Sequence, residues 1–438
     1  MELAEFVDAI WDGRLRVDEF HTGSAGEAEH MRTLRTAGWS TVAPDVGFWP
    51  ARSDVSAIRT GEGVVLIDTG ERVGADEMVA ALRQWTSERV DTVIYSHGHP
   101  DHTGGADALD RAADARQVPR PRVVAHEAVL DRFVKYRRSA EYNAIVNRRQ
   151  FQDPGITWPT EFRLPDRTYG RSGLTLDVGG VRFELHHARG ETDDQTWTWL
   201  PERRVLCCGD FFMWVAPNAG NPHKSQRFAV DWALALREMA ALGAVLLLPG
   251  HGYPIFGEDR IRAALTDVAD YLQSLHDQTL DLMNQGATLD TVVHSVVPPA
   301  HLLERPYLRP LFDDPEFVVR NVWRFYGGWF GGDPAWLKPA PEAELSRELA
   351  QLAGGAARLA GRATELARAG NLRLACHLAQ TAGLAAPQDR DVLLQRQSVF
   401  RQRAEQERSL MARSVYELAA RDPIPGGQAQ PAPRSSAS

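Results

Sequence analysis

The sequence is poor in cysteine, has no long apolar run and carries no excess of positive charge. Its only cysteines are Cys207, Cys208 and Cys376, which makes a disulfide framework implausible and predicts a reducing, cytoplasmic location. No run approaches the roughly 18 apolar residues that cross a bilayer, so we expect no membrane span. Residues Met1–Phe6 are acidic and lack the features of a secretory signal. The formal net charge of −9 argues against a nucleic-acid partner. These absences favour an enzyme that acts on a small molecule inside the cell.

The length and composition predict a soluble protein of two domains. A chain of 438 residues is too long for one ordinary core, and 43% hydrophobic with 24% charged residues is typical of globular proteins. We expect the first domain at residues 1–260, with residues 1–40 as an N-terminal extension, and a helical second domain at residues 261–422. Residues 423–438 are Pro/Gly/Ser/Ala/Gln-rich and predict a disordered tail.

The densest group of metal-binding side chains lies in the segment Ser96–Gly105, where His97, His99, Asp101 and His102 fall within six consecutive positions. A β-favouring stretch precedes this segment and an Ala/Leu-rich helical stretch follows it, so the side chains lie on a strand-to-helix loop and can converge. Imidazole and carboxylate suit zinc and, less exclusively, iron or manganese. The segment offers more ligands than one zinc ion needs, which predicts two adjacent metals; the alternative is a polar loop with solvated histidines.

Three further candidate ligands, Glu191, Asp210 and His251, follow other predicted strands. The strand that begins at Val181 runs into the turn that holds Glu191, and an apolar strand containing Cys207 and Cys208 ends at Asp210. His251 follows a third apolar strand and a glycine turn. Because strand ends can meet along one edge of a sheet sandwich, we expect these residues to join the histidine loop. Cys207 and Cys208 are interpreted as packing residues.

Several other side chains have two interpretations each. Asp68 either caps a turn or accepts a hydrogen bond from a metal-loop histidine. The basic stretch 131–150 is either a solvated helix face or a positive rim over an anionic substrate. Three aromatic residues either line a groove for an alkyl chain or pack in the core: Trp49, Phe212 and Trp214.

The histidine loop resembles the ligand loop of the metallo-β-lactamase superfamily, and Ile67-Asp68-Thr69-Gly70 resembles the superfamily's first motif. Most members have a histidine where this chain has Glu191, and alkyl sulfatases have a glutamate there. The stretches His276–Gly286 and Tyr326–Ala335 resemble the alkyl sulfatase dimerisation domain. The resemblance implies an α/β fold, namely a metallo-β-lactamase-type αββα sandwich, followed by an all-α dimerisation or helical-repeat domain that forms a homodimer.

The same resemblance implies a dinuclear metal site that hydrolyses alkyl sulfates or related anionic esters through a metal-activated hydroxide. Two zinc ions are expected, with iron or manganese as alternatives. The implied ligands are His97, His99 and Glu191 for one ion, and Asp101, His102 and His251 for the other, with Asp210 bridging them. Asp101 and Glu191 would also take part in catalysis, and Lys224 or Arg227 would anchor the substrate anion.

The alternatives to this function are hydrolysis of lactones, carboxylic esters, thioesters or phosphodiesters on the same scaffold. Iron redox chemistry is another alternative, and a binding protein with structural metals is a third.

Overall fold

The computed structural model describes residues 3–14 and 38–422. The chain forms two compact units, one spanning Met1–Ala144 and Thr157–Trp329, the other Ile145–Ile156 and Phe330–Ser438. The expected tail, residues 423–438, and residues 1–2 and 15–37 of the expected N-terminal extension lie outside the described residues. The expected domain boundaries at residues 260 and 422 stay a prediction.

The first sheet of unit 1 has seven strands in chain order: β1 (Ser40–Ala43), β2 (Val46–Trp49), β3 (Val55–Arg59), β4 (Val64–Ile67), β5 (Val90–Ile94), β6 (Arg122–His126) and β7 (Arg167–Tyr169). Strands β3 and β4 form an antiparallel hairpin around the glycine-rich turn at residues 61–63. Strands β4, β5 and β6 are parallel, and the helices α3 (Ala75–Trp85) and α5 (Ala106–Ala115) connect them. Parallel neighbours place their carboxyl ends at the same edge.

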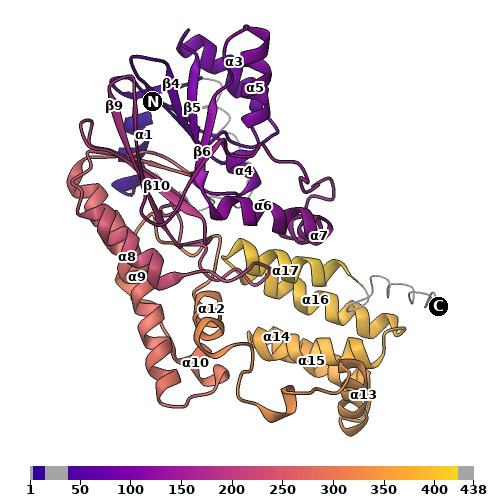
Figure 1. Ribbon diagram of the computed structural model, residues 1–438. Helices are drawn as coiled ribbons and strands as arrows, with labels where there is room; N and C mark the ends of the chain where they lie inside the picture. Colours follow the sequence, from indigo (N-terminus) through magenta and orange to yellow (C-terminus); the bar gives the residue numbers. More distant parts are fainter. Residues whose placement is uncertain (1–2, 15–37, 423–438) are drawn as a thin grey trace, which may run out of the picture. The chain divides into compact units, whose positions relative to one another are not determined.

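The second sheet has six strands in the order β13-β12-β11-β10-β9-β8. Their bounds are β8 (Leu174–Val178), β9 (Val181–Ala188), β10 (Gln195–Leu200), β11 (Val205–Gly209), β12 (Leu246–Pro249) and β13 (Ile255–Phe256). Strands β11 and β12 are parallel, so the segments that follow them also leave from one edge. The helices α8 (Ala229–Ala240) and α9 (Glu258–Asn284) lie side by side next to this sheet (Figure 1).

The alternation of side chains along the first sheet creates two apolar layers. Ile58, Val65 and Ile67 join a core that also contains side chains of the second sheet and of α8 and α9. The intervening residues Ala57 and Leu66 pack into a separate core with α3 and α5. Unit 1 therefore has the expected αββα order, with helices on the outer faces of two packed sheets (Figure 1).

The remaining helices of unit 1 are α1 (Leu3–Trp11), α4 (Pro100–Thr103), α6 (Ala128–Arg138), α10 (Leu289–Ser295), α11 (Ala300–Leu303) and α12 (Pro315–Gly327), and α7 (Ala140–Phe151) contributes residues to both units. Beyond α7, unit 2 contains η1 (Pro334–Trp336), α13 (Glu342–Leu352), α14 (Ala356–Arg368), α15 (Leu372–Ala385), α16 (Arg390–Gln406) and α17 (Leu410–Arg421). Helix α14 ends just before Gly370, and α15 ends just before Pro387. Among residues 3–14 and 38–422, no helix is long and apolar enough to cross a bilayer.

The structure decides several of the open interpretations in favour of packing. Phe212 and Trp214 have no exposed surface and Trp49 retains 4%, so all three belong to the core. Cys207 and Cys208 are buried as expected. The groove for an alkyl chain therefore has no support from these aromatic residues.

Candidate metal centre

All seven predicted metal ligands come together in unit 1, because each follows a strand whose end lies near the same edge. The loop after β5 supplies two histidines, the short helix α4 supplies an aspartate and a histidine, and the turns after β9, β11 and β12 supply the rest. Their ligand atoms form two groups, and the atoms of each group lie within 4.8 Å of one another: His97, His99, Glu191 and Asp210 in the first cluster, and Asp101, His102 and His251 in the second cluster. The sequence did not predict α4, which places Asp101 and His102 next to each other on one helical turn.

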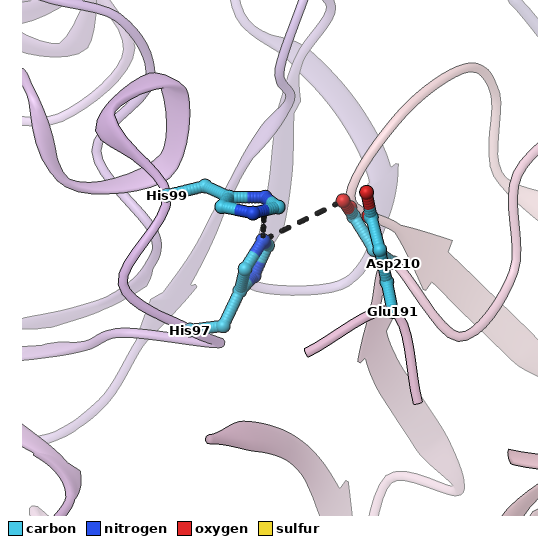
Figure 2. Close-up of side chains that lie close together, drawn as sticks. All are labelled: His97, His99, Glu191 and Asp210. Atoms are coloured by element: carbon cyan, nitrogen blue, oxygen red, sulfur yellow. Dashed lines mark hydrogen bonds and ion pairs between the residues drawn. The ribbon is translucent and has the colours of Figure 1, made fainter. Parts of the chain in front are cut away.

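In the first cluster the two imidazoles enter from one side and the two carboxylates from the other (Figure 2). The Nε2 atom of His97 lies 2.7 Å from Nδ1 of His99 and 3.6 Å from Oδ2 of Asp210. Burial lowers the pKa of His97 to about 4, so this ring is neutral at physiological pH. A neutral imidazole presents a lone pair and can ligate a metal.

In the second cluster the Nε2 atoms of His102 and His251 lie 3.2 Å apart. Oδ2 of Asp101 is 3.8 Å from Nε2 of His102 and 3.7 Å from that of His251. Asp210 reaches this cluster as well, since Oδ1 is 3.3 Å from Nε2 of His102 and Oδ2 is 3.5 Å from that of His251. Asp210 therefore lies between the two clusters, as the bridging role requires.

Hydrogen bonds at the outer nitrogens orient the histidines. Nδ1 of His102 donates to Oδ2 of Asp68 over 2.8 Å, which confirms the orienting role considered for Asp68. The Ser96 hydroxyl donates to the same carboxylate and can therefore accept from Nδ1 of His97. Nδ1 of His251 donates to the backbone carbonyl of Arg52. These outward bonds from Nδ1 leave Nε2 as the nitrogen that faces the cluster. Against the effect of burial, Asp210 raises the pKa of both His102 and His251, that of His251 to about 9, so a metal ion bound at Nε2 would replace a proton there.

The donor set fits a pair of divalent cations. In the first cluster, burial lowers the pKa of both His97 and His99, and two unprotonated nitrogens so close repel unless a cation lies between them. Within the described part of the chain, Oδ1 of Asp210 is buried with no hydrogen-bond partner. Burial raises the pKa of Glu191 to about 8, and the Asp210 carboxylate adds to this rise, although Arg227 opposes it. A metal ion would relieve all three features, and this mixture of nitrogen and oxygen donors suits zinc, iron or manganese.

Two side chains hold Glu191 in place. Nη1 of Arg227 lies 2.9 Å from Oε1 of Glu191 and also donates to the Glu191 backbone carbonyl. The side-chain amide of Asn218 donates to the same Oε1. Arg227 is only 4% exposed, so this is a buried ion pair. Arg227, the predicted anion anchor, thus contacts Glu191, which is a candidate metal ligand.

Lys224, the other predicted anion anchor, comes from the same loop. Its Nζ lies 5.6 Å from the centre of the Trp158 ring, a cation–π arrangement. Burial and the nearby Arg227 lower the pKa of Lys224 to about 8, whereas the charges of Glu191 and Asp101 raise it. Lys224 therefore lies close enough to both clusters for one carboxylate of each, Glu191 and Asp101, to raise its pKa.

Several residues that support the clusters were not predicted from the sequence. The Ser53 hydroxyl donates to Oδ2 of Asp101 over 2.7 Å, and nothing in the sequence around Ser53 indicates this long-range contact. Asp194 accepts the backbone N–H of Gly98. The sequence could have indicated a supporting role for Asp194, because Asp194 lies three residues after Glu191 in the same turn. The basic stretch 131–150 contains Arg132, which is buried and pairs with Asp194 instead of facing solvent or a substrate.

Comparison with known proteins matches two families. The metallo-beta-lactamase superfamily matches residues 49–251, and the alkyl sulfatase dimerisation family matches residues 288–423. A linear primary-alkylsulfatase from a Pseudomonas species is 30% identical over 323 residues, which cover 68% of this chain and 60% of that protein. An (R)-specific secondary-alkylsulfatase from Pseudomonas sp. is 26% identical over 396 residues, which cover 83% of this chain and 59% of that protein. This chain thus spans about 60% of the length of these curated relatives.

Among solved structures, the stereoselective inverting sec-alkylsulfatase Pisa1 from Pseudomonas sp. has a similar fold. The TM-score is 0.77 and the sequence identity is 24%, and the match covers 89% of this chain and 66% of that one. The αββα sandwich and the following helical region are therefore the fold that the sequence predicted.

Proposed function

Because this chain belongs to the metallo-β-lactamase superfamily and carries an alkyl sulfatase dimerisation region, we propose that it is a two-metal hydrolase of alkyl sulfate esters. The observation that carries the proposal is the pair of clusters, which share Asp210 and include Glu191 as a candidate oxygen ligand. The reaction converts an alkyl sulfate and water into an alcohol and hydrogen sulfate. The names of the two curated relatives support the substrate class.

The proposed ligands are His97, His99 and Glu191 for the first ion, and Asp101, His102 and His251 for the second, with Asp210 between them. Two divalent ions at these positions would lower the pKa of a bound water and stabilise negative charge that develops on the ester oxygens.

The residues of the chain itself would orient the reactants. The charges of His102 and His251 outweigh the effect of burial and lower the pKa of Asp101 to about 2, so Asp101 is ionised at neutral pH. An ionised carboxylate can accept a hydrogen bond from the attacking water. Lys224 supplies a positive charge for the sulfate group, and Arg227 keeps the Glu191 carboxylate in its position.

A substrate panel with the purified, metal-loaded protein tests this function. We expect turnover of a linear alkyl sulfate, with sulfate and alcohol released in equal amounts, and no turnover by a variant with Asp101→Asn. Turnover of lactones, thioesters or phosphodiesters in place of alkyl sulfates would contradict the sulfate ester assignment and leave the two-metal hydrolase intact. Hydrolysis in ¹⁸O-labelled water also identifies the broken bond, because the label enters sulfate if S–O breaks and the alcohol if C–O breaks.

A further inference from the structure

The peptide between the two histidines of the first cluster is held from outside the cluster. The backbone N–H of Gly98 donates to Oδ2 of Asp194 over 2.9 Å. A Cβ atom at position 98 would lie 3.0 Å from both Oδ2 of Asp194 and Cδ of Arg132. Glycine therefore allows the backbone of the histidine loop to approach these two side chains closely.

Asp194 is itself fixed by a buried ion pair. Its side chain has no exposed surface, and its second oxygen accepts from Nε of Arg132 over 2.8 Å. The Arg132 side chain is 8% exposed, and its Nη2 pairs with Asp193. Each oxygen of the Asp194 carboxylate thus has its own donor, so the carboxylate has one orientation that satisfies both.

This ion pair connects three segments that are far apart in the sequence. Gly98 lies between the candidate ligands His97 and His99, and Asp194 lies in the turn that supplies Glu191. Arg132 belongs to α6, and its guanidinium lies 5.8 Å from the centre of the Tyr136 ring. All of the first cluster except Asp210 therefore comes from two segments that Arg132 and Asp194 join.

The second cluster has supports of its own, although Asp68 also reaches His97 through Ser96. Ser53 contacts Asp101, Asp68 contacts His102, and the Arg52 carbonyl contacts His251. Arg132 and Asp194 make no hydrogen bond or ion pair with these supports among the interactions of the described residues. Loss of the Arg132–Asp194 pair should thus disturb one cluster and not the other.

We propose that Arg132 and Asp194 are positioning residues that hold His97, His99 and Glu191 in a metal-binding arrangement and so set the metal affinity of the first cluster separately from the second. This inference rests on the two-metal site proposed above. It goes beyond that proposal because it assigns control of the metal affinity of the first cluster to an ion pair whose members are not themselves candidate ligands.

The test is a Co²⁺ titration of the metal-free full-length protein. Calorimetry measures the two affinities, and visible absorption reports the surroundings of each bound ion. The variant with Asp194→Asn keeps the size of the side chain but turns an amide group toward either Gly98 or Arg132. We expect the wild type to bind two ions and this variant to bind one with wild-type affinity and the other about 10- to 100-fold more weakly, the usual range for a residue that orients a ligand. The visible spectrum of the first ion should change with it.

Two further variants separate positioning from general stability. Asp91 is a matched control, since it is 6% exposed and pairs with Arg89 over 2.6 Å and Arg122 over 3.2 Å at the start of β5, the end opposite His97. We expect Asp91→Asn to lower the melting temperature and leave both Co²⁺ affinities unchanged. The Arg132→Lys variant should bind Co²⁺ at the first cluster more tightly than the Arg132→Met variant does, because the lysine keeps the positive charge next to Asp194.

Each outcome decides the inference. Two wild-type affinities in the Asp194→Asn variant would overturn it and leave the proposed function standing. Equal weakening of both ions, or the same weakening in the Asp91→Asn variant, would also overturn it by showing a global effect. A wild-type protein that binds fewer than two ions would contradict the proposed two-metal function, and the inference would fail with it.

Discussion

A buried carboxylate needs a partner. Among the residues of the site, the pairing of Glu191 with Arg227 can be tested most directly. Both side chains are at most 5% exposed, so removing Arg227 leaves a buried charge without its partner. Such a loss costs about 3–5 kcal/mol in other proteins. Burial raises the pKa of Glu191 to about 8, so its charge is present above that pH. We therefore expect Arg227→Met to lower the free energy of unfolding by about that amount, measured by urea denaturation of the metal-free protein above pH 8.

The control for this variant is Arg237→Met. Arg237 pairs with Asp270 over 2.9 Å on the surface, where the side chains are 38% and 52% exposed. Exposed pairs contribute about 0–1 kcal/mol, so this substitution should have a small effect. Equal losses of unfolding free energy in both variants would show that burial does not make the Glu191–Arg227 pair more important for stability than an exposed pair.

Lys224 permits a separate test of anion binding. A hydrogen bond between charged groups contributes about 1.5–3 kcal/mol, which corresponds to roughly a 10- to 100-fold change in affinity. We expect Lys224→Met to raise KM for an alkyl sulfate by about 10-fold or more with a smaller change in kcat. Lys338, which is exposed and lies in unit 2, provides the matched control Lys338→Met. An unchanged KM in the Lys224 variant would exclude this lysine as the anion anchor.

At the scale of elements, the turn between α4 and α5 depends on close backbone contact. A Cβ atom at Gly105 would lie 2.1 Å from the carbonyl oxygen of Thr69, a distance that no packing can accommodate. We expect Gly105→Ala to destabilise the protein by at least about 1–3 kcal/mol, the range for overpacking. In contrast, a Cβ at Gly361 within α14 meets nothing within 4 Å, so Gly361→Ala should stabilise that helix by about 0.5–1 kcal/mol. Urea denaturation measures both, and a neutral Gly105→Ala would contradict the contact.

The loop that carries Asn218 is tied to the helical part of unit 1 by Asp313, which gives a prediction about pH. Oδ2 of Asp313 accepts the backbone N–H of Gly220 over 2.6 Å. Burial raises the pKa of Asp313 to about 7, well above its ordinary value of 3.8. The folded protein therefore holds this proton more tightly than the unfolded chain does, so this group's contribution to stability is present below pH 3.8 and declines as the pH rises to about 7.

An amide at position 313 cannot ionise and still accepts from Gly220. We expect Asp313→Asn to equal or fall slightly below the wild type in stability near pH 4 and to exceed it increasingly up to pH 7. Denaturation midpoints across this pH range measure the difference. A constant difference between variant and wild type at every pH would show that Asp313 does not titrate in this window.

At the scale of the whole molecule, the match to the alkyl sulfatase dimerisation family predicts a homodimer. One face of α13 carries Leu345, Leu349 and Leu352, which are 44%, 44% and 84% exposed and have helical spacing. We expect a solution mass of twice 48.6 kDa by light scattering, and a shift toward the monomer on dilution for Leu349→Glu. The control is Leu394→Glu on α16, where the leucine is 52% exposed. A wild-type monomer at all concentrations would contradict the prediction.

The sequence alone determined the fold class, through the resemblance of its motifs to the metallo-β-lactamase superfamily, and it determined the set of metal-binding candidates. Alternating apolar residues and glycine turns fix where strands end, and side chains at strand ends can meet at one edge, so His97, Glu191 and Asp210 could be grouped without coordinates. The cytoplasmic location and the lack of a nucleic-acid partner stay predictions, because they depend on composition alone.

Tertiary structure decided which residues hold that group in place. Arg132 belongs to a basic stretch that gave no sign of burial, and its pairing with Asp194 spans 62 positions of the chain. Likewise, Ser53 lies 48 positions from Asp101, and Arg227 lies 36 positions from Glu191. The local pattern of a sequence records which face of a strand or helix is apolar. It does not record which distant polar group a buried charge will meet, because that depends on how the sheets, turns and helices pack.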